Sequence, residues 1–328
     1  MASPLRIGMI GCGGFTRYRL NNTLKVAEAQ VVALSDPDAE QIRLTKEKHP
    51  ATADAKEYAD YKEMIASGEV DAVMIATPHT QHVDQILDAL NAGLHTLCEK
   101  PLITSVADAH RVIEARDQAG KVGMVSYQRR FQPEFRYVRE RLLSGEVGKL
   151  QFVVGLSCQE WKKATAGTWR QIPELSGGGQ LNDTGSHFVD ILLHLVGKRV
   201  ESVSAYGENR EVPVDIDSAL AIKFADGVLG TITIVGDAPA WHEEITLFTD
   251  SHAFYFRNGK LIEQAYQGQK QDVEVPEGDA VSPDQHFVDC ILKGIPCESP
   301  FEAGLEVIGL TEAAWNSMAA NGAAMTVA

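Results

Sequence analysis

Short apolar runs alternate with longer stretches of helical spacing over residues 1–125, and this alternation constrains the fold more than any other feature of the sequence. Strands and helices that alternate in this way form a parallel sheet with helices packed on its faces. Strands are expected at Arg6–Ile10, Ala29–Ser35, Ala72–Ala76, His95–Cys98 and Val122–Val125. Helices are expected at Tyr18–Ala27, Asp38–Lys48, Tyr58–Ala66, His82–Asn91 and Ser105–Ala119. The sequence therefore predicts an α/β fold whose first domain, over residues 1–127, contains a parallel sheet.

The pattern changes after Tyr127 to an Arg-rich helix followed by strands that are separated by turns. Asp226-Gly227 and Asn258-Gly259 are strong hairpin signals, so an antiparallel or mixed sheet is expected here. Its strands are predicted at Leu150–Ser157, Val200–Tyr206, Ser218–Phe224, Val228–Val235, Glu244–Thr249 and Ala253–Arg257. Helices are predicted at Pro133–Leu143, Ser186–Leu195, Pro283–Leu292 and Phe301–Ala320. Residues 128–328 are thus expected to form a second, α+β domain.

Composition narrows the possible partners and surroundings. A net charge of −15 over 328 residues repels nucleic acid and anionic membranes, so neither is expected as a partner. No run of roughly 18 apolar residues is present that would predict a membrane span. The five cysteines are scattered and form no C-x-x-C pair, which favours a reducing, cytoplasmic location.

A glycine-rich loop directly after the first strand is the first sign of a ligand. Gly11-Cys12-Gly13-Gly14-Phe15-Thr16-Arg17 opens a helix, whose free N–H groups can bind a pyrophosphate. A tight strand-to-helix turn also needs glycine, so the loop alone is weak evidence. Asp36 closes the second strand, where an acidic residue binds the adenosine ribose, although it also suits a helix N-cap. Together they predict a dinucleotide site for NAD, with NADP less favoured because the carboxylate repels a 2′-phosphate.

Three residues are candidates for acid/base chemistry. Lys100 follows the fourth strand and can polarise a carbonyl or assist proton transfer, or can be a solvated loop lysine. Asp183 and His187 lie four residues apart at a helix start and suit work on a substrate hydroxyl. The alternatives for this pair are a metal site, with too few ligands nearby to be favoured, and an Asp N-cap beside an incidental histidine.

Several motifs follow one another along the chain: the glycine loop, Ala76-Thr77-Pro78 with His82, Glu99-Lys100-Pro101, Arg129-Arg130-Phe131, Trp169-Arg170, Ser176-Gly177-Gly178-Gly179 and Asp183-x-x-x-His187. Over essentially the whole chain, this ordered set resembles the Gfo/Idh/MocA family, the group of glucose-fructose oxidoreductase and inositol dehydrogenase. The resemblance implies a Rossmann domain, a C-terminal domain with a large, mostly antiparallel open sheet, and NAD(P)-dependent oxidation or reduction of a sugar or polyol carbon.

The resemblance also implies roles for individual residues. Lys100, Asp183 and His187 match the catalytic set, and with Trp161 they are expected to contact the substrate. No metal is expected. Cofactor contacts are expected from Gly11, Gly13, Gly14, Phe15, Thr16, Asp36, Thr77, Pro78, His82, Glu99, Lys100, Gln128, Trp169 and Arg170.

Several alternatives stay open. Trp161 can stack on the C–H face of a sugar or can be buried packing. The arginines from Arg129 to Arg141 are expected to form a solvated helix face, with capture of a substrate anion as the minority interpretation. The leading function is a dehydrogenase or reductase of a cyclic sugar, inositol or related polyol. An NAD-dependent glycosidase that oxidises its substrate transiently and a non-catalytic dinucleotide sensor are the rivals. A homodimer or homotetramer is expected, because the open sheet leaves one face to cover.

Overall fold

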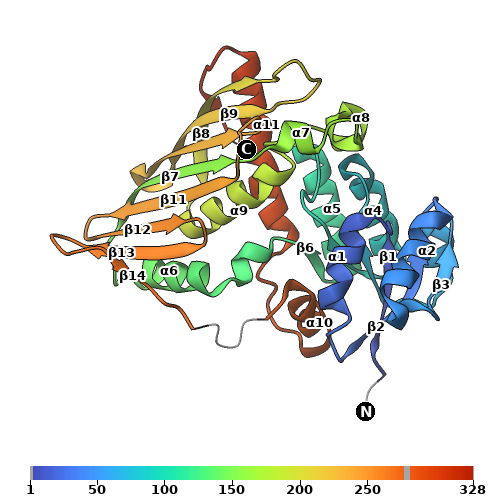
Figure 1. The fold of residues 1–328 in the computed structure, drawn as a ribbon. Coiled ribbons are helices and arrows are strands. Elements are labelled where there is room, and N and C mark those ends of the chain that lie inside the picture. Colours follow the sequence, from blue (N-terminus) through green and yellow to red (C-terminus); the bar gives the residue numbers. More distant parts are fainter. Residues whose placement is uncertain (1–2, 277–280, 328) are drawn as a thin grey trace. The chain divides into compact units, whose positions relative to one another are not determined.

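The computed structural model describes residues 3–276 and 281–327, which divide into two compact units (Figure 1). The first unit contains the described residues of Met1–Ile103, Ala107–Gln128 and Val281–Gly304, and the second contains the remainder. The sequence placed all of 128–328 in the second domain, and this is wrong for Val281–Gly304. That segment belongs to the first unit because Asp284 accepts hydrogen bonds from Arg19 (3.2 Å) and Thr23 (2.6 Å).

The first unit is built on a six-stranded parallel sheet, as the alternation of strands and helices predicts. The strands are β1 (Leu5–Ile10), β2 (Ala29–Ser35), β3 (Lys56–Tyr58), β4 (Ala72–Ile75), β5 (His95–Cys98) and β6 (Gly123–Val125), in the order β3-β2-β1-β4-β5-β6. The helices are α1 (Gly14–Thr23), α2 (Ala39–Lys48), α3 (Tyr61–Ala66), α4 (His82–Asn91), α5 (Val106–Ala119) and α10 (Pro283–Lys293). Sequence analysis missed β3, whose three residues carry no apolar run.

The strand order reverses direction between β1 and β4. Open α/β sheets bind their ligands at the carboxyl ends of the strands at such a point, because the helices leave on opposite sides there. The glycine loop follows β1 and Thr77 follows β4, so both lie at this switch point.

The second unit contains a nine-stranded sheet that is antiparallel except where β10 pairs with β7. Its strands are β7 (Leu150–Cys158), β8 (Val200–Glu208), β9 (Asp217–Phe224), β10 (Leu229–Val235), β11 (His242–Thr249), β12 (His252–Arg257), β13 (Lys260–Ala265), β14 (Gln271–Asp272) and β15 (Met325–Thr326). The helices are α6 (Pro133–Ser144), α7 (Trp161–Ala164), α8 (Pro173–Ser176), α9 (Thr184–Val196) and α11 (Phe301–Ala319). The large, mostly antiparallel sheet confirms the expected fold class, and the short strands β13, β14 and β15 were not predicted.

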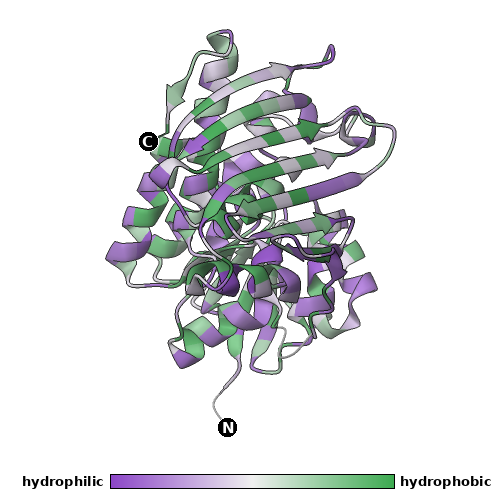
Figure 2. Cartoon of the chain, turned by 90° about the vertical axis from the view of Figure 1, so that its left-hand side faces the viewer, coloured by the Kyte–Doolittle hydropathy of each residue, from purple (hydrophilic) through white to green (hydrophobic). Residues whose placement is uncertain are grey.

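Helix α9 packs on this sheet, with Phe188 and Leu192 lying against Gly155 of β7. Residues on this face are buried, as at Val153 and Leu247, and alternate with exposed ones along the strands. Figure 2 shows hydrophobic residues along the strands of the sheet. The core of the unit therefore lies between the sheet and α9.

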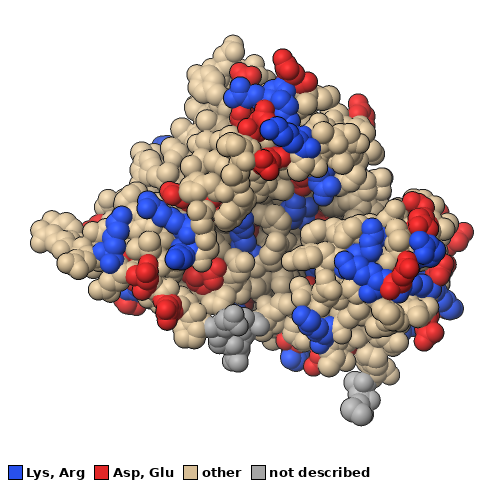
Figure 3. Space-filling model, viewed as in Figure 1, with Lys and Arg blue, Asp and Glu red and all other residues tan. Residues whose placement is uncertain are grey.

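The face shown in Figure 3 carries both signs of charge side by side. On α2, for example, Arg43 pairs with Glu40 and Glu47. No helix within the ranges 3–276 and 281–327 combines the length and the apolar character needed to cross a membrane.

Candidate active site

The glycine loop is shaped for a pyrophosphate. Gly11 has a φ of +85°, and a Cβ there would lie 2.9 Å from the Ala76 carbonyl oxygen and from Thr77 Cγ2. A Cβ on Gly13 or Gly14 would meet no described atom within 4 Å, so the surface above the loop is open. Helix α1 begins at Gly14, and all its residues are described; its first turn holds no acidic side chain to compete with a phosphate. The loop and the free N–H groups of α1 thus fit the phosphates of a dinucleotide.

Thr16 occupies the third position of the fingerprint, where glycine or alanine is usual. Its side chain is buried, and its hydroxyl donates to the Gly11 carbonyl oxygen at 2.5 Å. The threonine therefore closes the loop with its own hydrogen bond.

Asp36 holds the same loop from the end of β2. Its Oδ2 accepts the Cys12 backbone N–H at 2.8 Å, and its Oδ1 accepts the Asp38 N–H at 2.9 Å. The side chain that caps α2 is that of Asp38, which accepts the Glu40 N–H, so the N-cap interpretation of Asp36 is wrong. Because a carboxylate has about four lone-pair sites, Asp36 keeps capacity to accept a ribose hydroxyl.

His82 contacts the loops that follow β4 and β5. It is fully buried at the start of α4, with Nε2 3.0 Å from the Thr77 carbonyl oxygen and Nδ1 2.9 Å from that of Pro101. Burial lowers the pKa of the imidazole, nearby Lys100 adds to this effect, and the hydrogen bonds to backbone carbonyl groups oppose it. Its place inside the protein makes it a residue that positions the loops after β4 and β5.

Glu99 belongs to a buried ionic cluster that sequence analysis did not find. Its carboxylate pairs with Arg19 of α1, and Arg19 also bonds to Ser126 (2.8 Å) and Asp284. Burial raises the pKa of Glu99, and the Arg19 guanidinium opposes this shift. The cluster fixes the backbone next to Lys100, which is half-buried two residues beyond β5. No local pattern predicts it, because its members are separated by up to 265 positions in the chain.

In the second unit the structure brings Asp183, Trp161 and Arg170 together. Asp183 is 1% exposed, and its Oδ2 accepts from Trp161 Nε1 at 2.8 Å and from Arg170 Nε at 3.0 Å. In the described structure Asp183 stands at the N-cap of α9 without a side-chain capping bond, so it is not a simple N-cap aspartate. His187 lies half-buried one turn further along α9.

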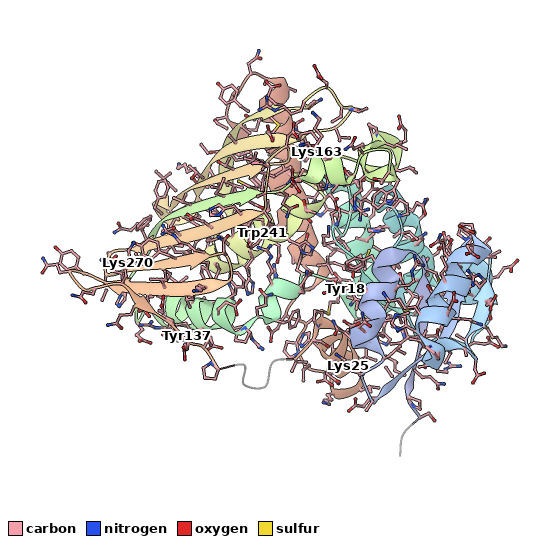
Figure 4. All side chains as sticks on the ribbon, in the orientation of Figure 1. Tyr18, Lys25, Tyr137, Lys163, Trp241 and Lys270 are labelled. Carbon is pink, nitrogen blue, oxygen red and sulfur yellow. The ribbon has the colours of Figure 1, made fainter. Side chains whose placement is uncertain are left out.

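The two tryptophans of this region differ in their surroundings. Trp161 is 4% exposed and packs with Val214 and Ile216, so its ring is part of the core while its N–H holds Asp183. Trp169 is half-buried and lies under the Arg170 guanidinium, 4.5 Å from ring centroid to Cζ. Gln128 is exposed in the first unit, and Trp241, labelled in Figure 4, is 54% exposed just before β11.

The glycine segment before Asp183 is anchored by a carboxylate that sequence analysis missed. Asp215 accepts the backbone N–H groups of Gly179 and Leu181, each at 2.9 Å, and the Trp315 indole N–H at 3.0 Å. A Cβ on Gly179 would lie 1.9 Å from the Asp215 carbonyl oxygen. Burial raises the pKa of Asp215, and the three donors oppose that shift. The close approach of two backbones explains why glycine is needed here.

The arginines after residue 128 do not form the solvated face that was expected. Arg130 is buried and binds both carboxylate oxygens of Asp190, whose pKa burial raises to about 6. Arg129 likewise pairs with Glu243 at 2.6 Å. These side chains therefore join elements of the second unit.

Comparison with known families gives a consistent result for both halves of the chain. Residues 5–127 match the model of an oxidoreductase family with an NAD-binding Rossmann fold, and residues 135–254 match the Gfo/Idh/MocA C-terminal domain.

Similar proteins include several dehydrogenases. The chain is 30% identical over 246 residues to the 1-carboxy-3-chloro-3,4-dihydroxycyclohexa-1,5-diene dehydrogenase of Comamonas testosteroni, a match that covers 74% of this chain and 60% of that protein, less than two thirds of its length. It is 29% identical over 234 residues to the myo-inositol 2-dehydrogenase of Thermotoga maritima, covering 70% of this chain and 67% of that protein. A levoglucosan dehydrogenase solved with NADH and levoglucosan shares the fold, with a TM-score of 0.90, 20% identity and coverage of 99% of this chain and 100% of that one.

Proposed function

This chain belongs to the Gfo/Idh/MocA family of oxidoreductases, and from that premise we propose that it is an NAD-dependent dehydrogenase or reductase of a cyclic sugar, inositol or related polyol. One observation carries the proposal: a buried Asp183 carboxylate, held by Trp161 and Arg170, at the start of the helix that presents His187. The names of the relatives support the substrate class, since inositol and levoglucosan are both rings that bear several hydroxyl groups.

The cofactor is proposed to be held by the first unit. The N–H groups of the glycine loop and α1 would bind its phosphates, and Asp36 would accept the adenosine ribose hydroxyls. The nicotinamide, when bound, supplies the hydride acceptor or donor. Phe15, Thr77, Pro78, Gln128, Trp169 and Arg170 remain predicted cofactor contacts.

Side chains of the protein are proposed to take up the proton of the reacting hydroxyl. Oxidation of a secondary alcohol requires a base within hydrogen-bond reach of the reacting hydroxyl, and His187 takes this role. Lys100 donates to the same oxygen and stabilises the negative charge that develops on it. Asp183 orients the substrate hydroxyl or the histidine, since Trp161 and Arg170 fix its carboxylate in place.

Screening the full chain against sugars and polyols, with absorbance of reduced nicotinamide as the readout, tests the function. On the best substrate, His187→Ala and Lys100→Ala should each lose roughly 10²-fold or more in turnover while the affinity for NAD changes little. His110→Ala and Lys25→Ala, which remove exposed side chains of the same types, are the matched controls and should keep parent turnover.

The outcome separates the proposal from its rivals. Release of hydrolysed glycoside without net reduced nicotinamide would identify the glycosidase, and NAD binding without turnover on any compound would indicate the sensor. If His187→Ala keeps the turnover of the parent across the pH range, His187 is not the base.

A further inference from the structure

A histidine and two cysteines meet in the first unit, away from the residues discussed above. His286 and Cys290 lie one turn apart on α10 and so share a helix face, and Cys297 follows in the segment after Gly294 ends the helix. One ring nitrogen of His286, Cys290 Sγ and Cys297 Sγ all lie within 4.8 Å of one another. His286 and Cys290 are buried, whereas Cys297 is half-buried. A reagent in solvent therefore reaches Cys297 more readily than Cys290.

The hydrogen bonds of the cluster favour thiol chemistry over a bound metal ion. The backbone N–H of Glu298 donates to His286 Nε2 at 3.0 Å, so the lone pair of this nitrogen already has a hydrogen-bond donor. Cys290 Sγ lies 3.3 Å from the same nitrogen. A metal ion at Nε2 would have to displace the backbone donor, because both need the same lone pair.

The surroundings also give Cys297 a different pKa from the other cysteines. Hydrogen bonding from the Cys290 thiol, followed by interactions with His286 and the Ser299 backbone, outweighs burial and lowers the pKa of Cys297 to about 5. Burial instead raises the pKa of Cys12, Cys98 and Cys158. Because the thiolate is the reactive form, Cys297 is the nucleophile of the cluster, and Cys290 can act as the resolving cysteine.

We propose that Cys297 and Cys290 form a dithiol that reacts with hydroperoxides and closes to a reversible disulfide. The Cys297 thiolate attacks one peroxide oxygen and the O–O bond breaks, which leaves a sulfenic acid on Cys297 and releases hydroxide or alkoxide, protonated by water. Cys290 then attacks the sulfenic sulfur; the S–S bond forms, and the S–OH oxygen leaves as water with the Cys290 proton. The two sulfurs give up two electrons, and the hydroperoxide receives them.

Hydrogen peroxide treatment of the reduced full chain tests the proposal, with thiol alkylation and peptide mapping as the readout. We expect a Cys290–Cys297 disulfide that dithiothreitol reverses, while Cys12, Cys98 and Cys158 stay reduced. Cys290→Ser should stop at a sulfenic acid that dimedone traps on Cys297, and Cys297→Ser should leave Cys290 reduced. Cys158→Ser removes the other half-buried cysteine outside the cluster and should form the disulfide like the parent.

Two results would overturn the proposal. One is oxidation of Cys297 no faster than that of Cys158, where we expect a difference of roughly tenfold or more near neutral pH because only Cys297 is largely thiolate. The other is a metal site: titration of the reduced chain with Co²⁺ would then give thiolate-to-cobalt absorption and protect both cysteines from alkylation. We expect neither absorption nor protection.

Discussion

At the scale of single residues, Asp36 serves the protein in two ways. Its carboxylate fixes the glycine loop through Cys12 and the following turn through Asp38, and it places a negative charge where an adenosine ribose is proposed to bind. A 2′-phosphate would meet that charge directly, whereas two ribose hydroxyls can donate to it. The same side chain therefore shapes the loop and is proposed to favour NAD over NADP.

We predict that the chain binds NAD more tightly than NADP and that Asp36→Ala reduces this preference by roughly tenfold, the scale of one charge-assisted hydrogen bond. Calorimetric titration with both dinucleotides measures it. Asp38→Ala, which removes an exposed carboxylate two residues away, should keep the parent preference. A parent chain that prefers NADP would refute the role of Asp36, and Arg17 would then be examined.

At the scale of elements, the turn before α9 depends on contact between two backbones. Gly179 and Leu181 donate to the Asp215 carboxylate, and Gly179 lies too close to the Asp215 backbone for any side chain. This contact fixes the position of Asp183 and of the start of α9. The segment that leads into Asp183 is thus positioned by a residue that is 36 positions from Gly179 in the chain.

Gly179→Ala should lower the free energy of unfolding by roughly 1–3 kcal/mol, because the added methyl group forces the two backbones apart. Urea unfolding of the parent and variant chains measures the change. Gly14→Ala serves as the control, since its Cβ meets no described atom within 4 Å and alanine suits a helix start. An unchanged unfolding midpoint for Gly179→Ala would show that the segment adapts freely.

At the scale of the whole molecule, the sheet of the second unit leaves one face with exposed apolar side chains. The pairing register places Phe152 and Val154 of β7 on one face with Leu229 of β10 and Phe248 of β11. Three of them, Val154, Leu229 and Phe248, are 38–46% exposed. Apolar side chains gathered on one face favour burial against another copy of the chain.

We therefore expect a homo-oligomer, and light scattering at micromolar concentration measures it. A Val154→Glu, Phe248→Glu double variant should shift the mass toward the monomer, because two charges would have to be buried at the interface. Leu292→Glu introduces the same charge at an exposed apolar position of α10 and should leave the mass unchanged. A monomeric parent chain would contradict the expectation.

Local patterns were enough to predict much of this protein from its sequence. Strands β2 and β5 begin and end where predicted, and the parallel order of the first sheet follows from the alternation of strands and helices. The glycine loop and Asp36 could be proposed as cofactor contacts because a phosphate-binding turn needs particular residues within a short stretch of chain. Side-chain period and turn chemistry act over a few residues, so a sequence displays them directly.

Tertiary structure alone decided which distant side chains meet. Arg19 with Asp284, Arg130 with Asp190 and Gly179 with Asp215 are 265, 60 and 36 positions apart, and no spacing rule connects them. The same holds for Val281–Gly304, which belongs to the first unit although it follows most of the second in sequence. Burying a charge is costly unless a partner is supplied, and that partner can come from any part of the chain that the fold brings near.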